Sequence, residues 1–446
     1  MSRVDDAGRN PVATARIATA CDSVVAVGAA TATGATVFAK NSDRMPAGEC
    51  QPLLQIAAAD HASGSAVGCQ YVEIDQVDHT HALVLSSPYW MWGGEHGVNE
   101  HAVAVGNHSI FTRDPVPARG LLGMDLVRLA LERGTSAAGA VDVIVELVER
   151  HGQGGSGYVD QDWGYHSSFT VADPRRAFLL EASGRNWALR EVADVASGTN
   201  HTTITTDWSR LSDDCVAHAV EQGWCHGGDR SRFDFAAAYR DVSVVPALVS
   251  SGRYRASCAG LDAGRGTLDG ERFKRLMRDH FEAGDVFRPG IEPDDDRYFC
   301  ICRHDALGPT TASMVAELTD PGHSPQLVWV ALCNPCIGPY LPVFPAGRVP
   351  AALQRGGAEP SPDSAWWAFK GLLDQVERDY ERNGPRVREH WREYENGLVR
   401  RTAEVVGAAV GDPPGQRGRR LSGFMDETCR EALGQVDELT GRLRGG

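Results

Sequence analysis

The chain has 446 residues, of which 42% are hydrophobic and 23% are charged, and its formal net charge is −15. This composition is ordinary for a globular protein with a sizeable core, and the length suggests two to three domains or one large domain with extensions. An acidic chain without a long basic run is a poor candidate for binding phosphate backbones, so we expect no nucleic-acid partner. No run of residues approaches the ~18 apolar residues of a spanning helix, and we expect no membrane partner.

The first twenty residues differ from the sequence that follows them. They are weakly patterned and lack the apolar block of about 7–15 residues that a secretory signal needs. The eleven cysteines are odd in number and scattered, which does not indicate a disulfide framework. We therefore expect a cytoplasmic protein in which residues 1–20 are a propeptide or leader, removed by cleavage between Ala20 and Cys21.

The first predicted elements are strands. Residues 22–28 and 35–39 are β-prone, and the "TATG" between them supplies turn chemistry, which together predict a hairpin. Apolar alternation predicts further strands, and apolar residues at helical spacing then predict two helices. These elements are the strands 69–77, 81–87 and 98–106 and the helices 119–133 and 136–150.

Strands are expected again after the helix pair, with a mainly helical stretch inside this part of the chain. The expected strands are 167–172, 177–181, 186–191, 200–205, 297–304, 311–318 and 326–333. Two groups of strands that flank a helix pair indicate an α+β fold, with two stacked sheets covered by helices. After a main domain at 21–345 we expect a linker at 346–361 and a helical extension at 362–446, where Pro385 should break or kink a helix.

Cys21 is the candidate nucleophile. Cleavage before it would leave a thiol and a free α-amine on one residue, and the amine can take the thiol's proton directly or through one water. The return strand of the hairpin brings a polar cluster to the same end, where Lys40 would lower the pKa of the thiol and Asp43 would orient the α-ammonium. Asn41 would tie the end of the hairpin together. Composition alone also allows an inert, buried cysteine ahead of a polar turn.

Several separated blocks of sequence carry a family resemblance. They are "CDSVVAV…GATVFAKNSDR" from Cys21, "SSPYWMWGGEHGVNEHAVAVGN" at 86–107, "FLLEASGRNWALREV" at 178–192, "GTNHTTI" at 198–204 and "TTASMVAEL" at 310–318. In this order they resemble the secernin and dipeptidase family of N-terminal-nucleophile (Ntn) cysteine hydrolases. The resemblance covers roughly residues 21–345. It implies a four-layer αββα sandwich, here with added C-terminal helices, in which Cys21 becomes the mature N-terminus and attacks an amide carbonyl.

The resemblance also implies roles for two asparagines. Asn99 falls where relatives have an asparagine near the nucleophile, and Asn200 falls where they have the oxyanion-hole amide. An amide N–H₂ that points at a developing oxyanion stabilises the tetrahedral intermediate. Distant relatives carry an Arg-Asn-x-Asp motif where this chain has "KNSD", so that Lys40 replaces arginine, as in the secernins. Relatives also use a second arginine near the nucleophile, and the sequence leaves three candidates: Arg232, Arg253 and Arg255.

Substrate-binding residues are expected on the rim of the same site. Glu95 or Glu100 could hold the α-ammonium of a substrate, as a dipeptidase would need, and Trp92 could form an apolar wall. Asn41 is also assigned to this group. Solvated loop carboxylates and ordinary packing of the tryptophan are the structural alternatives.

These observations predict an autoprocessed, zymogen-like thiol hydrolase that cleaves a small peptide or another amide without a cofactor. A homo-oligomer is possible. An acylase or acyltransferase of specialised metabolism is one alternative, and it would form the same thioester on Cys21. A non-catalytic, secernin-like regulatory protein is the other, and it would form no thioester. The spacing of Cys300 and Cys302, followed by Cys333 and Cys336, is loosely zinc-like. Their flanks are apolar strand sequence and the histidines add no further ligand spacing, so we expect no metal.

Overall fold

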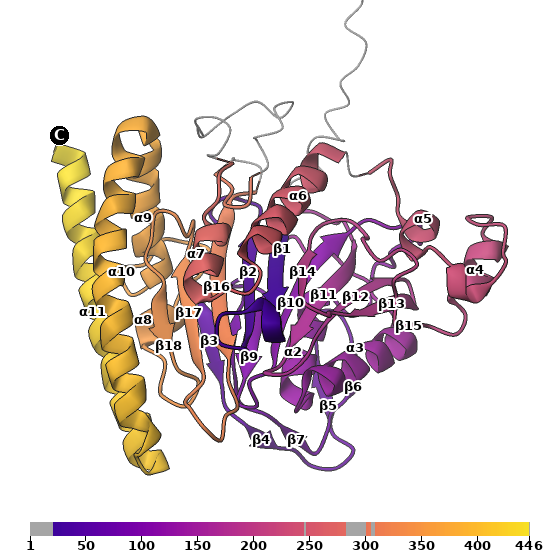
Figure 1. Ribbon diagram of the computed structural model, residues 1–446, viewed down its shortest axis with the longest axis horizontal. Helices are drawn as coiled ribbons and strands as arrows, with labels where there is room; N and C mark the ends of the chain where they lie inside the picture. Colours follow the sequence, from indigo (N-terminus) through magenta and orange to yellow (C-terminus); the bar gives the residue numbers. More distant parts are fainter. Residues whose placement is uncertain (1–20, 245–246, 282–299, 305–307, 446) are drawn as a thin grey trace, which may run out of the picture.

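Two antiparallel sheets form the centre of the protein (Figure 1). The computed structural model describes residues 21–244, 247–281, 300–304 and 308–445. The six-stranded sheet has the order β14-β1-β2-β16-β17-β18. Its strands are β1 (Cys21–Ala26), β2 (Thr36–Asp43), β14 (Val195–Gly198), β16 (Thr310–Leu318), β17 (Leu327–Leu332) and β18 (Leu341–Val343).

The eight-stranded sheet has the order β15-β13-β12-β11-β10-β9-β8-β3. Its strands are β3 (Leu53–Ile56), β8 (Leu83–Ser86), β9 (His96–Asn99), β10 (Ala104–Ile110), β11 (His166–Ala172), β12 (Ala177–Ser183), β13 (Asn186–Glu191) and β15 (Arg210–Leu211). The two sheets face one another where β1 lies against β10 and β11, and there the hydroxyls of Ser23 and Thr170 hydrogen-bond at 2.6 Å.

Helices cover the outer face of each sheet. Helices α2 (Gly123–Arg133) and α3 (Ala137–His151) pack on the eight-stranded sheet, and their apolar residues share a core with its strands. Helices α6 (Ala247–Gly264) and α7 (Gly270–Met277) pack on the six-stranded sheet. The described residues therefore form the expected α+β, four-layer αββα architecture.

Three long helices close the end of the six-stranded sheet beyond β18 (Figure 1). They are α9 (Ala365–Glu377), α10 (Tyr380–Val410) and α11 (Pro414–Gly445). Shorter elements complete the described chain: α4 (Cys215–Glu221), α5 (Phe235–Tyr239), α8 (Ala351–Gln354), and the small ribbons β4 (Ala59–Asp60) with β7 (His79–Thr80) and β5 (Ala66–Gly68) with β6 (Glu73–Asp75). Among the described residues, no helix combines the length and the apolar character needed to cross a bilayer.

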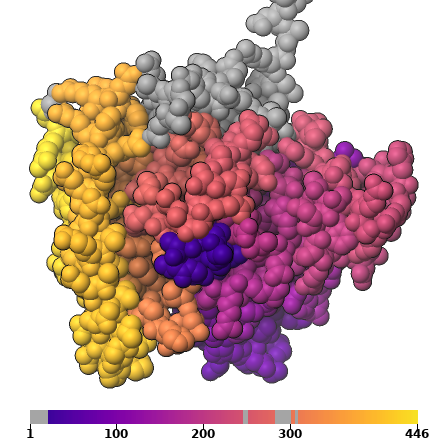
Figure 2. Space-filling model, viewed as in Figure 1, coloured from indigo at the N-terminus to yellow at the C-terminus, as the bar shows by residue number. Residues whose placement is uncertain are grey.

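The predicted hairpin is confirmed as β1 and β2, and it is buried along both strands. Figure 2 shows that indigo atoms of this N-terminal part reach the surface; they belong to the exposed turn between the two strands. The predicted helix pair is also confirmed, as α2 and α3.

Some expected elements are wrong. The stretch 69–77 is not one strand but holds only β6 of a separate ribbon, and β14 lies at Val195–Gly198 rather than at 200–205. Of the strand expected at 297–304, the described residues 300–304 are not in a strand, and the others lie outside the described residues. Pro385 does not end a helix: it lies inside α10, five residues after Tyr380, where its missing N–H removes one intrahelical hydrogen bond.

Candidate active site

Cys21 is the first residue of β1, and its side chain is only 4% exposed. Its register partner on β2 is Ser42, whereas the pairing of β1 with β14 begins only at Ser23. The backbone nitrogen of Cys21 therefore has no strand partner on that side. It donates instead to the side-chain oxygen Oδ1 of Asn200, at 2.8 Å.

The orientation of the Asn200 carboxamide follows from its other contacts. Its Oδ1 also accepts a hydrogen bond from Nη2 of Arg253 at 2.7 Å, and its Nδ2 donates to the carbonyl oxygen and the hydroxyl of Ser109 at 2.9 and 3.0 Å. A guanidinium only donates, so the atom that faces Arg253 must be the oxygen. The expected role of Asn200 as an oxyanion donor is therefore not what this geometry provides: its N–H₂ is used by Ser109, and its oxygen orients the nitrogen of Cys21.

The side chains of β1 and β2 alternate between two environments. Cys21 and Lys40 point toward the other sheet, whereas Asp22, Asn41 and Asp43 point toward the covering helices, because successive strand residues face opposite ways. Nδ2 of Asn41 accordingly donates to the carbonyl oxygens of Met277 and Ile301, at 2.8 and 2.9 Å. Asn41 thus ties β2 to the end of α7, and it is not a substrate-binding residue as the sequence predicted.

A buried ion network lies beside the thiol on the side of the second sheet. Nζ of Lys40 donates to the Glu95 carboxylate at 2.9 Å, to the Glu95 carbonyl oxygen at 2.8 Å and to Asn107 at 3.1 Å. Arg44 contacts the other carboxylate oxygen of Glu95 at 3.0 Å, and Sγ of Cys21 lies 3.9 Å from that carboxylate. Burial would raise the pKa of Glu95, yet Lys40 and Arg44 hold it below its usual value. With both oxygens engaged, Glu95 neutralises internal cations and does not hold a substrate's ammonium as expected.

A second charged cluster lies on the helix side of the hairpin. Arg253 of α6 pairs with Asp22, and its Nη1 lies 3.7 Å from Asp43, while Oδ1 of Asp43 accepts from the hydroxyl of Thr310 at 2.7 Å. Arg253 is fully buried. Among the three candidate arginines it is the one that reaches Cys21's surroundings, through Asn200, because Arg232 and Arg255 are exposed.

Burial dominates the protonation of the site. Burial raises the pKa of the Cys21 thiol to about 12; the charge of Lys40 opposes this, and Glu95 and Asp43 add to it. Burial also raises the pKa of Asp43 to about 7, although Arg303 and Arg253 lower it. A thiol in this environment is protonated at neutral pH, so it needs an adjacent base to become a nucleophile.

Three of the expected site residues lie elsewhere. Asn99 donates to the carbonyl oxygens of Leu131 and Gly134 at 2.9 and 2.7 Å, so its amide holds β9 to the end of α2 and is not an oxyanion donor. Glu100 is exposed and accepts from the backbone nitrogen of Ala82 at 2.7 Å.

Trp92 is the third of these residues. Its ring lies 4.0 Å from the guanidinium carbon of Arg128 and packs on the core under α2 and α3, on the outer face of the eight-stranded sheet. The expectation that it walls the substrate pocket is therefore wrong, and its role is packing.

A cavity of about 430 Å³ is lined by Ile110, the last residue of β10, and by the aromatic residues that follow β10 and precede β11. Its wall includes Phe111 and Trp163, whose rings stack with centroids 5.0 Å apart. Tyr165 also lines this cavity, and its hydroxyl lies within electrostatic reach of Arg44, Glu95 and Cys21. Among the described residues that line the cavity, Asp162 is the only one with a carboxylate, and it is exposed.

Sequence reasoning missed Asp22, Arg44 and Ser109 as members of this site. Asp22 follows directly on Cys21 as a charged residue ahead of an apolar run, and Arg44 ends the polar run that begins at Lys40, so both carried a signal in the sequence. Ser109 carried no such signal, because it is one of several small residues on β10.

Comparison with known proteins gives distant structural similarities. No family model matches the chain. Two single-residue variants of the conjugated bile acid hydrolase from Clostridium perfringens are 11% and 12% identical to it, each with a TM-score of 0.40 and with 70% of this chain and 89% of that chain covered. The Caenorhabditis elegans ortholog of N-acylethanolamine-hydrolyzing acid amidase is 12% identical, with a TM-score of 0.32 and with 68% of this chain and 93% of that chain covered.

Proposed function

We propose that the protein is an Ntn cysteine hydrolase that cleaves an amide bond through a thioester on Cys21. The supporting observation is the hydrogen bond from the backbone nitrogen of Cys21 to Oδ1 of Asn200, which lies next to the thiol inside one buried polar cluster. A buried backbone N–H without a strand partner needs an acceptor in any case, so the support comes from the position of this acceptor beside the thiol. The α-amine that cleavage after Ala20 would release needs an acceptor there, because it must be oriented to act as a base.

The reaction follows from this arrangement. The free amine of Cys21 takes the thiol's proton, the thiolate attacks the carbonyl carbon of the substrate, and the amine passes the proton to the leaving nitrogen. Water then attacks the thioester and gives up a proton to the same amine, which returns it to the thiolate as the carboxylic acid leaves. Asn200 holds the amine, and Arg253 holds Asn200. Lys40 favours the thiolate electrostatically.

We further propose that the substrate is a small peptide-like amide whose side chain enters the cavity lined by Phe111, Trp163 and Tyr165. Small-molecule sites typically combine aromatic side chains with a few placed polar groups. Here the polar groups of the lining include Thr112, Asp162 and His166. With Glu95 engaged by Lys40 and Arg44, Asp162 is the carboxylate that would bind the α-ammonium of a dipeptide. An acylase would place an acyl chain against the same aromatic wall, so the alternative to a dipeptide is an N-acyl amide.

Processing and turnover can be tested separately. Intact mass and N-terminal sequencing of the purified chain should show a mature form that begins at Cys21. A chain expressed to begin at this cysteine should hydrolyse members of a panel of dipeptides and N-acyl amino acids, with products identified by mass spectrometry. Cys21→Ser should keep the fold and lose most turnover. A protein that keeps residues 1–20 and is as active as the shortened chain would contradict the mechanism, as would an unimpaired Cys21→Ser variant.

A further inference from the structure

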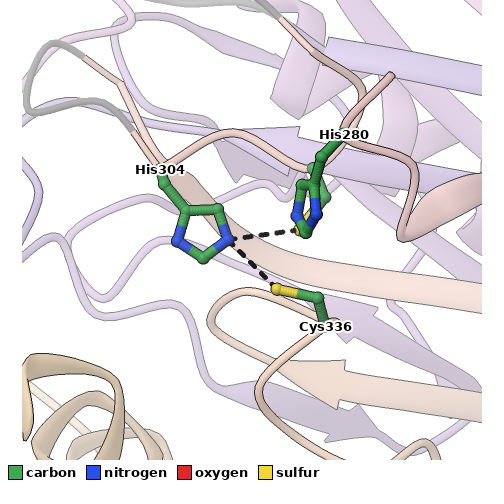
Figure 3. A group of neighbouring side chains, drawn as sticks. His280, His304 and Cys336 are labelled. Atoms are coloured by element: carbon green, nitrogen blue, oxygen red, sulfur yellow. Dashed lines mark hydrogen bonds between the residues drawn. The ribbon is translucent and has the colours of Figure 1, made fainter. Parts of the chain in front are cut away.

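A second buried cluster of reactive side chains lies behind the hairpin, at the covering helices. It consists of His280, Cys302, His304 and Cys336, each at most 6% exposed, and one possible ligand atom from each residue lies within 4.8 Å of all the others. Figure 3 shows His280, His304 and Cys336 pointing toward a common centre from three separate segments of the chain. His280 follows α7, His304 lies in the segment 300–304, and Cys336 lies in the loop between β17 and β18.

The spacing of these atoms is close to that of a tetrahedral metal site. Zinc bonds of about 2.3 Å to sulfur and about 2.0 Å to nitrogen set tetrahedral ligand atoms roughly 3.3–3.8 Å apart. Nε2 of His304 lies 3.0 Å from Sγ of Cys336 and 3.9 Å from Sγ of Cys302. Shifts of a few tenths of an ångström in the side chains would bring these pairs to that spacing.

Charge also favours a divalent cation at this position. Two thiolates and two neutral imidazoles balance Zn²⁺, so the loaded site carries no net charge, which suits its burial. Binding would release the two thiol protons to solvent. Other cysteines of the same segments are directed away: Sγ of Cys300 donates to the carbonyl oxygen of Cys302, and Sγ of Cys333 to that of Trp366.

The surroundings of the cluster resemble the outer layer of a metal site. Nδ1 of His304 hydrogen-bonds to the Glu377 carboxylate at 3.0 Å, which leaves Nε2 to face the two sulfur atoms. A metal-ligating histidine usually has such a carboxylate on its other nitrogen. Nδ2 of Asn334 lies 3.8 Å from Sγ of Cys302, where it can donate to a thiolate.

From these contacts we propose that His280, Cys302, His304 and Cys336 form a structural zinc site. The proposal departs from the sequence-based expectation of no metal: it takes one cysteine from each of the two closely spaced pairs and adds two histidines. All four positions are filled by the protein, which distinguishes a structural site from a catalytic one that keeps an open position.

The site would fasten the segment at 300–304 to α7, to the β17–β18 loop and, through Glu377, to α9. This segment also supplies the carbonyl oxygen of Ile301 to Asn41, and it carries Arg303, whose charge lowers the pKa of Asp43. Zinc would therefore stabilise the helix-side wall of the Cys21 site without touching Cys21. The proposal stands on its own contacts and does not require the proposed hydrolase activity.

The test is metal analysis of the full-length chain, purified under reducing conditions and reconstituted with Zn²⁺. Wild type should hold about one zinc per chain. Cys302→Ser and Cys336→Ser should hold almost none, whereas Cys300→Ser and Cys333→Ser, matched changes in the same segments, should hold as much as wild type. With Co²⁺ in place of zinc, the wild type should show thiolate charge-transfer and tetrahedral d–d absorption, and Cys336→Ser should not.

A milder variant keeps the proposal testable if the ligand variants do not fold. Glu377→Gln should weaken zinc affinity about 10–100-fold in competition with a chelating dye, and Asp374→Asn, one turn earlier on α9, should not. A chelator should lower the melting temperature of the wild type. Two results would overturn the proposal: no zinc uptake by folded wild type, or equal uptake by the Cys336→Ser variant.

Discussion

Arg253 is the residue that joins the charged cluster on the helix side to Asn200, which holds the nitrogen of Cys21. Its guanidinium pairs with Asp22, approaches Asp43 and donates to Asn200. Because a guanidinium presents several donors in a fixed plane, one side chain can orient Asn200 and neutralise buried carboxylates at the same time. Lysine, with a single ammonium, could not make these contacts together.

Arg253→Met is expected to destabilise the protein by about 3–5 kcal/mol, because it leaves buried carboxylates without their cation. Arg255→Met is the matched control: it changes an exposed arginine on the same helix and should alter the free energy of unfolding by less than about 0.5 kcal/mol. Urea unfolding of both variants measures the difference. Equal stabilities would show that Arg253 does not compensate Asp22 and Asp43.

The raised pKa of Asp43 predicts a pH dependence of stability. The pKa is about 7 in the folded protein against 3.8 for the free side chain, so between these values the folded state binds the proton more tightly than the unfolded state does. The stability that this carboxyl contributes is therefore present below pH 4 and is lost as the pH rises to 7, by an amount on the order of 4 kcal/mol.

Asp43→Asn should remove this slope. Between pH 4.5 and pH 7 its free energy of unfolding should fall less than that of wild type, as measured by denaturant titration at each pH. Asp60→Asn, at an exposed carboxylate, should keep the wild-type slope. Identical slopes for wild type and Asp43→Asn would mean that Asp43 stays ionised throughout this range.

At the scale of elements, α9 is joined to the strand that borders the site. Trp366 on α9 is 1% exposed, and its indole nitrogen donates to the carbonyl oxygen of Thr311 on β16 at 2.9 Å. The hydroxyl of Thr310, which precedes Thr311 in β16, donates to Asp43. The helix therefore holds the end of β16 that contacts the charged cluster.

Trp366→Ala is expected to cost about 3–5 kcal/mol, since it leaves a large cavity and an unpaired carbonyl group. Trp367→Ala, at the half-buried neighbour on the same helix, should cost clearly less. Thermal or urea unfolding of the pair tests this. A larger loss for Trp367→Ala would show that α9 is anchored through its other face.

The elements that the sequence predicted well are those whose partners lie nearby in the chain. The β1–β2 hairpin and the α2–α3 pair are set by local turns and local apolar spacing. The strand expected at 200–205 was wrong, because pairing with β1, which decides the position of β14, comes from far away in the sequence.

In the site, too, the residues placed by nearby sequence could be predicted, and those placed by distant packing could not. The hairpin alone brings Cys21 and Lys40 to one face, so both could be placed from the sequence. Asn99 was misplaced because the packing of α2 decides where its amide points. Arg253 could not be chosen among three arginines until α6 was seen to pack on β1.

At the scale of the whole molecule, the C-terminal helices share the main core. Buried side chains of α9 and α11 belong to the same apolar cluster as those of β16, β17 and β18. The helical extension predicted at 362–446 therefore covers the end of the six-stranded sheet, and Figure 2 shows it along one whole side of the protein.

A chain that ends at residue 361 is consequently expected not to fold as a soluble monomer. Trp366, Phe369, Leu373 and Val376 of α9 are each at most 3% exposed, as are Leu421 and Met425 of α11. At about 1.5–3 kcal/mol for each fully buried side chain, these six contribute on the order of 10 kcal/mol, which is as large as the whole stability of a typical domain. Deleting them also exposes the strands that they cover.

Size-exclusion chromatography and circular dichroism of the shortened chain provide the measurement, with a chain that ends at residue 440 as the control. That control keeps Leu439, which is 8% exposed, and every buried residue of α11 before it, so it should remain a folded monomer. The chain ending at 361 should aggregate or lose its cooperative transition. If it instead unfolds cooperatively near the wild-type midpoint, the sheet does not need its C-terminal cover, and residues 21–345 would be an independent domain, as the sequence first suggested.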